Sequence, residues 1–259
     1  MAILAKTTND LYPDLIALGG LENTLQSALR EIGSALTVLE LDKDLSLAVC
    51  ACVESGSRYS QVRIAAEERM FFLDFWARGV MLAQGRTPRL TELARAIDKW
   101  VASSCSTADL AAAFSFVAVE PKAAAYERGE EVEERWRSYI NVIGFPELAP
   151  FVEAASRRPQ LRQLFPYTSM NIFCFSRCTG YPFTLDTPFV RPVKENWYEV
   201  WSASGVVLGH GDAEAAAELV VANLPPGCGP AVPGTADDLG GAEPGVAPDP
   251  ARRQVSGNS

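Results

Sequence analysis

The hydrophobic positions in the first third of the chain follow two different periods. Leu21, Leu25, Ala28, Leu29 and Ile32 recur at the spacing that lines one side of an α-helix. Short β-prone segments separated by turn residues come next, at residues 36–42, 45–54, 58–66, 69–77 and 80–85. This change of period predicts one helix followed by an antiparallel β-meander.

The middle of the chain returns to helical spacing. Thr87 and Pro88 suit the start of a helix. The apolar stripe of this helix is expected to lie on the sheet and consists of Leu90, Leu93, Ala94, Ile97 and Val101. Three further helices are predicted over residues 106–117, where Ser106 and Asp109 resemble a capping box, and over residues 121–140 and 146–158.

Strand character reappears near the end of the chain. We expect strands at residues 170–178 and 196–211, where Ser204 and Gly205 supply a hairpin turn. Asp212 is placed to cap a closing helix. The predicted fold class is therefore α+β: a mainly antiparallel sheet, made of the N-terminal meander and the C-terminal strands, covered by central and terminal helices.

The same pattern predicts the domain organisation. Residues 1–224 are expected to form a single globular α+β domain, or two lobes at residues 1–86 (helix plus meander) and 87–224 (helical segment plus C-terminal hairpin and helix). Residues 225–259 are rich in proline and glycine and contain no aromatic residue. Burial there cannot offset the entropy lost on ordering, so this tail is predicted to be disordered.

Composition excludes several classes of function. The 259 residues are 48% hydrophobic, enough for a core, and carry a net charge of −9. That charge repels polyphosphate and anionic lipid, so neither nucleic acid nor a membrane is an expected partner. No apolar stretch approaches the about 20 residues of a spanning helix. The six cysteines are too sparse for a disulfide framework and the N-terminus has no apolar signal segment, so a cytoplasmic location is expected.

The cysteine spacings argue against a metal site. If residues 171–178 are extended, Cys174 and Cys178 lie roughly 13 Å apart, too far for a disulfide or for chelation. Cys174 is interpreted as a small core residue. Cys50 and Cys52 share one face of a predicted strand, but metal sites usually need four ligands, so core packing is the favoured interpretation. The common phosphate-binding and catalytic motifs are absent, and we expect neither metal nor cofactor.

Three residues are candidates for catalysis: Cys178, Asp74 and His210. Cys178 follows Arg177, a cation that favours a reactive thiolate. Asp74 lies between aromatic residues on a predicted strand, and His210 is the single histidine, so any histidine-assisted mechanism must use it. Each also has a structural interpretation: a strand end for Cys178, a satisfied buried carboxylate for Asp74 and a turn for His210.

Hydroxyl, cationic and aromatic side chains gather near the expected strand ends. This set consists of Thr168, Ser169, Arg177, Tyr181 and Trp197. Such side chains suit the recognition of an anionic or planar small molecule, or of a partner peptide. We therefore treat them as the candidate ligand-binding residues.

Four segments carry a resemblance to a known family. They are AAAFSFVAVEPKAAAYERG (111–129), LRQLFPYTSM (161–170), FSRCTGYPFT (175–184) and VVANLPPGCGPA (220–231). Over most of residues 10–232 the chain resembles an actinobacterial family of unknown function whose members are commonly described as natural-product biosynthesis proteins. The family often has a histidine after the Thr-Ser pair, where this chain has Met170. The resemblance implies a place in secondary metabolism but no particular reaction.

Two functions fit these residues. The first is a cytoplasmic accessory or binding protein of natural-product biosynthesis that recognises a small molecule or a partner protein. The second is a tailoring enzyme that uses Cys178 or Asp74 with His210 for thiol or general acid–base chemistry on a biosynthetic intermediate. We favour the first because the usual catalytic motifs are absent and each catalytic candidate has a structural explanation. No pattern in the sequence specifies an oligomeric state.

Overall fold

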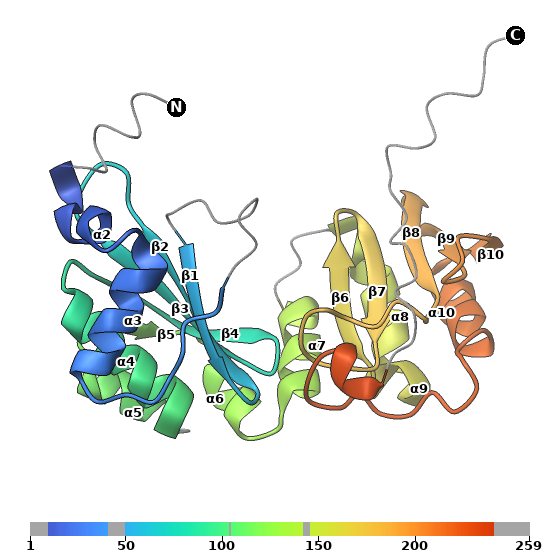
Figure 1. Ribbon diagram of the computed structural model, residues 1–259. Coiled ribbons are helices and arrows are strands. Elements are labelled where there is room, and N and C mark those ends of the chain that lie inside the picture. The colour runs from blue at the N-terminus through green and yellow to red at the C-terminus, as the bar shows by residue number, and fades with distance from the viewer. Residues whose placement is uncertain (1–9, 41–49, 104, 142–145, 241–259) are drawn as a thin grey trace, which may run out of the picture. The chain divides into compact units, whose positions relative to one another are not determined.

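The chain folds into two compact units. The structure, a computed structural model, describes residues 10–40, 50–103, 105–141 and 146–240 (Figure 1). The first unit is Met1–Glu127 and the second is Arg128–Ser259. Each contains a five-stranded sheet of its own, so the two strand regions do not join into one sheet. The predicted α+β class, with antiparallel sheets and covering helices, is confirmed.

The sheet of the first unit is an antiparallel meander in the order β1-β2-β3-β4-β5. Its strands are β1 (Cys50–Ser55), β2 (Arg58–Ile64), β3 (Phe71–Ala77), β4 (Val80–Thr87) and β5 (Val117–Val119). The predicted meander is confirmed for β1 to β4. Of the segment expected at 36–42, Val38 forms an isolated bridge to Val53, and residues 41–49 lie outside the described residues.

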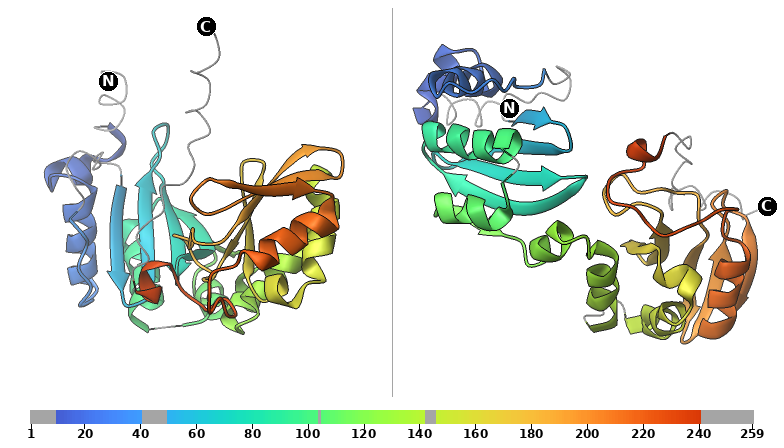
Figure 2. Two further views of the ribbon diagram at one scale, coloured as in Figure 1. Left: turned by 90° about the vertical axis from the view of Figure 1, so that its right-hand side faces the viewer. Right: turned by 90° about the horizontal axis from the view of Figure 1, so that it is seen from below.

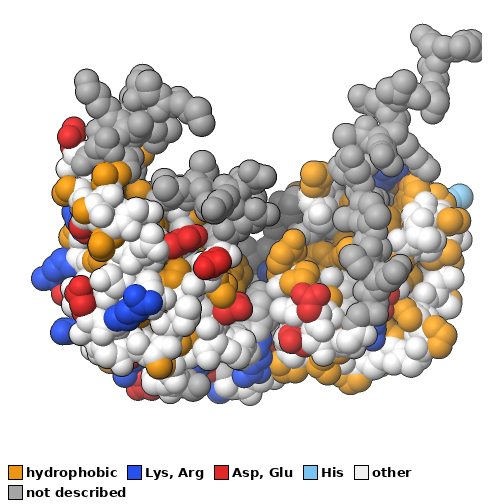
Figure 3. Space-filling view, viewed as in Figure 1, with side chains coloured by type: hydrophobic (Ala, Val, Ile, Leu, Met, Phe, Trp, Pro, Cys, Tyr) orange, Lys and Arg blue, Asp and Glu red, His pale blue; other side chains and the backbone are white. Residues whose placement is uncertain are grey.

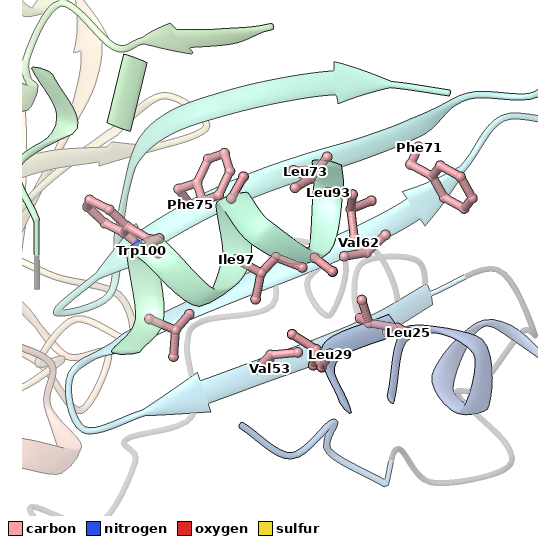
Figure 4. Packing of buried hydrophobic residues seen from close by; sticks show 14 of the residues in the cluster. Leu25, Leu29, Val53, Val62, Phe71, Leu73, Phe75, Leu93, Ile97 and Trp100 are labelled. Atoms are coloured by element: carbon pink, nitrogen blue, oxygen red, sulfur yellow. The ribbon is translucent and has the colours of Figure 1, made fainter. Parts of the chain in front are cut away.

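Helices cover one face of this sheet. They are α2 (Pro13–Ala17), α3 (Leu21–Glu31), α4 (Leu90–Ser103), α5 (Thr107–Ala113) and α6 (Ala123–Glu127). Figure 4 shows Leu25 and Leu29 of α3, and Ile97 of α4, directed at the sheet residues Val53 and Val62. The apolar stripes predicted for α3 and α4 are therefore the ones that form the core.

Two helix predictions in this region were wrong: one helix ends early, and the other is broken in its middle. The capping box at Ser106 is present, and its hydroxyl accepts from the Asp109 amide at 3.0 Å, but the helix ends at Ala113 and residues 117–119 form β5. The helix expected over 121–140 is broken at Gly129, whose φ of +78° is accessible to glycine at little cost. This break adjoins the boundary between the two units, Glu127/Arg128, whereas the sequence pattern suggested a lobe boundary after residue 86.

The sheet of the second unit has the order β10-β9-β8-β7-β6 and is also antiparallel. Its strands are β6 (Phe165–Ser169), β7 (Ile172–Ser176), β8 (Phe189–Lys194), β9 (Trp197–Trp201) and β10 (Val207–Gly211). The hairpin of β9 and β10, with Gly205 at φ +79°, is confirmed. The strand expected over 170–178 ends at Ser176, and neither β6 nor β8 was predicted.

Helices again cover one face. They are α7 (Glu131–Asn141), α8 (Ala149–Ser156), α9 (Pro159–Arg162) and α10 (Ala213–Ala222), with a 3-10 turn at Pro146–Leu148 that divides the helix expected over 146–158. Figure 2 shows α8 and α10 side by side against the strands. The predicted cap is confirmed, since Asp212 Oδ1 accepts from the Ala215 amide at 3.0 Å. In the described residues no helix has the length and apolar character needed to span a bilayer.

The disorder predicted from Pro225 onwards does not hold for residues 225–240, here called the C-terminal segment. Its Val232 amide donates to the Arg177 carbonyl at 3.0 Å, and the Val232 carbonyl accepts from the Thr179 amide at 3.1 Å. The segment ends in a 3-10 turn, Asp237–Leu239. Backbone pairing therefore orders it in spite of its composition. Residues 241–259 lie outside the described residues.

Candidate functional site

The two faces of the second sheet have different chemistry. Phe173, Phe175, Val190, Tyr198 and Val200 point toward the helices and belong to the hydrophobic core. Because side chains alternate along a strand, the residues between them lie on the opposite face, which we call the outer face. The strand pairs place Phe189 beside Trp201, Arg191 beside Glu199, and Glu199 beside His210 on this face.

One part of the outer face is covered by the loop of residues 177–188. The ring of Phe183 stacks on Tyr167 of β6 with ring centroids 4.5 Å apart. The Thr184 hydroxyl accepts from the Arg177 amide at 2.9 Å and contacts Ser176. Burial raises the pKa of the Tyr167 phenol, and it raises the pKa of the neighbouring Cys174 thiol to about 12. This part of the face is therefore closed and holds its acids in the neutral form.

The rest of the outer face carries aromatic rings and cations, and we call it the aromatic–cationic face. Its members are Phe189, Arg191, Lys194, Trp197, Glu199, Trp201 and His210. The Phe189 and Trp201 rings are stacked, 6.2 Å apart with planes at 7°. The hydrophobic side chains around the single histidine are visible at the surface in Figure 3.

Trp197 is the more accessible of the two indole rings on this face. It is 36% exposed, and the Lys194 ammonium nitrogen lies 5.3 Å from its centroid. The His210 imidazole lies 5.6 Å from it, centroid to centroid. A cation beside an indole face is attracted by the ring quadrupole, which holds Lys194 at this position. The three side chains together offer one stacking surface, one positive charge and one imidazole.

The two cations of the face differ in how they are paired. The Arg191 guanidinium lies over Trp201 at 5.5 Å and forms an ion pair with Glu199 at 2.9 Å. Glu199 also accepts from the Trp201 indole at 3.3 Å. Lys194, in contrast, has no carboxylate within ion-pair distance among the residues that the structure describes. Its charge is therefore the one available to an incoming anion.

The ligand-binding residues expected from the sequence are not brought together. Arg177 follows the end of β7 that is opposite to Ser169, about 17 Å along the strand direction. Thr168 bonds to the Tyr139 hydroxyl at 3.0 Å, Ser169 is exposed at the end of β6, and Tyr181 is exposed on the covering loop. Of that set, Trp197 alone belongs to the aromatic–cationic face.

Arg177 has a structural partner that the sequence did not reveal. Its Nε donates to Asp186 Oδ2 at 2.8 Å, and its Nη2 lies 2.5 Å from the same oxygen. This hydrogen bond raises the pKa of the Arg177 guanidinium. Arg177 also acts on the thiol of Cys228 in the C-terminal segment. Burial raises the pKa of that thiol, and the positive charge of Arg177 opposes the rise. Arg177 therefore fastens the loop and is not free to bind an anion.

Within the second unit, the catalytic candidates Cys178 and His210 do not lie together. Cys178 has no exposed surface, and its sulfur contacts the Ser176 hydroxyl at 3.3 Å and the Gly180 carbonyl at 3.5 Å. His210 is on β10, separated from β7 by two strands, or about 14 Å. Asp74 belongs to the first unit, where it forms an ion pair with Arg63 at 2.7 Å. Within the second unit, then, the thiol has no imidazole beside it.

Sequence reasoning missed most of the aromatic–cationic face. Arg191 and Lys194 were not identified because the strand β8 was not recognised, and Glu199 and Trp201 of the predicted strand β9 were not singled out because their partners on β8 were unknown. The signal was the alternation in FVRPVKENWYEVW, residues 189–201, in which most of the odd-numbered positions are aromatic or charged, although Lys194 falls out of phase where the pairing shifts. Pro192 obscured it, since proline within a run argues against a central strand.

Comparison with known proteins identifies one family. Comparisons with curated proteins and with solved structures each found no match. A family model matches part of the second unit, from close to its start, and does not extend into the first unit. The resemblance seen in the sequence segments had been expected to cover most of residues 10–232. Residues 130–235, which include the whole aromatic–cationic face, are thus similar to a family described as a family of unknown function (DUF6193).

Proposed function

We propose that the protein is a noncatalytic binding protein whose second unit recognises a planar, anionic small molecule on the aromatic–cationic face. The observation that carries the proposal is the exposed ring of Trp197 between the Lys194 ammonium, at 5.3 Å, and the His210 imidazole, at 5.6 Å. A flat aromatic acid matches the first two of these groups: its ring stacks on the indole, and its carboxylate meets the ammonium.

The expected strength of this contact is modest. An aromatic pair contributes roughly 0.5–1.5 kcal/mol beyond the area that it buries. A hydrogen bond to a charged group contributes about 1.5–3 kcal/mol. Together with the apolar area covered on Trp197, these terms correspond to dissociation constants between millimolar and micromolar.

Local charge decides where an anion binds. The net charge of −9 disfavours anions over most of the surface. Solvent ions screen that field beyond about 10 Å at 0.1 M salt, so the nearest charges dominate. Lys194 supplies a positive charge that Glu199 does not neutralise, since that carboxylate is paired with Arg191. This arrangement favours an anion at Trp197 in spite of the acidic protein.

The alternative is a tailoring enzyme that uses Cys178 or Asp74 with His210. An activated cysteine needs an accessible sulfur and a base beside it. The Cys178 sulfur is buried and directed at backbone carbonyls, and Asp74 already binds Arg63. These contacts favour binding over turnover. We further propose that binding takes place in the cytoplasm, as expected from the sparse cysteines, and that it serves natural-product biosynthesis in an actinobacterium, as the sequence resemblance implies.

A thermal-shift experiment tests the proposal. The full chain is heated with a panel of aromatic carboxylates, including salicylate and 2-naphthoate, and with non-aromatic carboxylates of similar charge. A ligand at a hundred times its dissociation constant adds about 2.7 kcal/mol to the stability of the folded state. We expect an aromatic carboxylate to raise the melting temperature of the wild type and to leave that of Trp197→Ala unchanged.

Tyr181→Ala is the matched control, because Tyr181 is an exposed aromatic residue, 69% exposed, that lies outside the aromatic–cationic face. This variant should keep the full shift. The proposal fails if no aromatic carboxylate raises the melting temperature, or if Trp197→Ala keeps the shift. A bound compound that is recovered chemically altered would favour the enzyme instead.

A further inference from the structure

Cys50 and Cys52 do not have the core position that the sequence indicated. In β1 it is Ala51 and Val53 that have no exposed surface and belong to the core. The two cysteines therefore lie on the opposite face of the first sheet, and both are free and half-buried. Cysteine is among the residues most often found fully buried. Core packing thus gives no account of two cysteines on this face.

The two thiols are neighbours. Residues two apart on a strand point to the same side, with Cα atoms about 6.6 Å apart. The Cys50 and Cys52 side chains therefore lie next to each other on the same face of β1. The Gln61 amide on β2 donates to Cys50 Sγ at 3.4 Å. The pair therefore has one polar donor already directed at it.

The geometry suits a bridging ion better than a disulfide. A disulfide places Cα atoms most often about 5.5–6 Å apart, closer than an extended strand places residues i and i+2. An ion bound between two sulfurs at about 2.3 Å each spans up to about 4.6 Å without moving the backbone. The strand can therefore keep its pairing with β2 while both sulfurs bind.

The number of ligands selects the kind of ion. Among the described residues, no group of three or more histidine, cysteine or carboxylate side chains is placed to hold a metal. Structural zinc sites are almost always four-coordinate, whereas soft thiolate ligands also select monovalent copper. A pair of thiolates without further protein ligands therefore fits a soft ion of low coordination number.

We propose that Cys50 and Cys52 form a two-sulfur binding site for a soft monovalent metal ion of the Cu(I) class. In the binding step each thiol releases one proton to solvent and two sulfur–copper bonds form. Neither sulfur nor copper changes oxidation state, and the complex carries one negative charge. The site is independent of the ligand proposed for the second unit.

A Cu(I) titration of the reduced full chain tests the proposal. Cu(I) is added without oxygen in competition with the chelator bathocuproine disulfonate. The wild type should retain one equivalent more than Cys50→Ser and one more than Cys52→Ser. Cys105→Ser is the control and should behave as the wild type, because Cys105 is a half-buried thiol that contacts the Lys99 carbonyl at 3.4 Å. Equal uptake by the wild type and both variants overturns the site.

A second reagent covers the case in which a serine variant does not fold. Phenylarsine oxide joins two thiols at once, forming two arsenic–sulfur bonds and releasing its oxygen as water. The wild type should retain the reagent in excess monothiol, on the tryptic peptide that contains Cys50 and Cys52. Loss of the reagent to the monothiol, or recovery of a disulfide between the two cysteines in its place, contradicts a metal-binding pair.

Discussion

The ring of Trp197 lies 5.6 Å from the imidazole of His210, on the neighbouring strands β9 and β10. Because His210 is exposed, its replacement removes a possible donor to the ligand without opening the core. We expect His210→Ala to weaken the binding of an aromatic carboxylate roughly fivefold, which corresponds to the loss of one neutral hydrogen bond of about 1 kcal/mol. Isothermal titration measures this, and an unchanged affinity would remove His210 from the site.

Arg177→Ala should lower stability and leave ligand binding intact. The substitution removes both contacts to Asp186, whose Oδ1 is already buried without a partner. Hydrogen bonds to charged groups contribute about 1.5–3 kcal/mol, so we expect a loss near 2 kcal/mol in urea unfolding. Arg137→Ala is the control, since its ion pair with Glu134 is more exposed. A loss no larger than that of the control would contradict this role.

The C-terminal segment is expected to protect Cys178. Backbone hydrogen bonds join it to Arg177, Thr179 and Gly180, on both sides of this thiol. A chain that ends at Leu224 loses these bonds, each of which has a net value of about 1 kcal/mol. Alkylation of Cys178 should then accelerate by roughly tenfold or more, because local opening costs less. If mass spectrometry finds the same rate in both chains, the segment does not protect the thiol.

The first unit should lose stability in acid through Asp14. The hydrogen bond from Arg69, at 2.7 Å, holds the pKa of this carboxyl below its usual value. The unfolded chain therefore takes up the proton first as pH falls, so the stabilisation is present above about pH 4 and is lost below it. Both side chains are about one-third exposed, and solvent screening keeps the effect under about 1 kcal/mol.

Urea unfolding of the wild type and of Asp14→Asn measures this loss. The two should differ at neutral pH and converge as the pH falls through the lowered pKa of the folded state, below which the carboxyl is neutral in both states. A difference that stays the same size throughout this pH range would mean that the ion pair does not contribute.

Local signals predicted much of the fold. The cap at Asp212, the capping box at Ser106 and the stripe of α4 depend on residues within a few positions of each other, and all were found. The strands β6 and β8 were missed because each contains a proline, and their pairing comes from distant parts of the chain.

The site was less predictable than the fold. Trp197 was identified, but Lys194 and Arg191 depend on the register of β8 against β9. Arg177 was predicted to bind a ligand because its true partner, Asp186, is nine positions further along the chain. The two side chains come into contact only when the loop folds. The C-terminal segment was expected to be disordered because its composition does not show that Val232 finds a backbone partner. In each case the missing information was a contact between segments, not a property of one segment.

The most direct test of the aromatic–cationic face is a titration of the ¹⁵N-labelled protein with an aromatic carboxylate, observed through the indole NH signals. The chain has five tryptophans, assigned by single substitutions. We predict that the Trp197 signal moves with the ligand, while the fully buried Trp100 and Trp136 keep their positions. A saturated protein in which the Trp197 signal has not moved would contradict the proposed binding site.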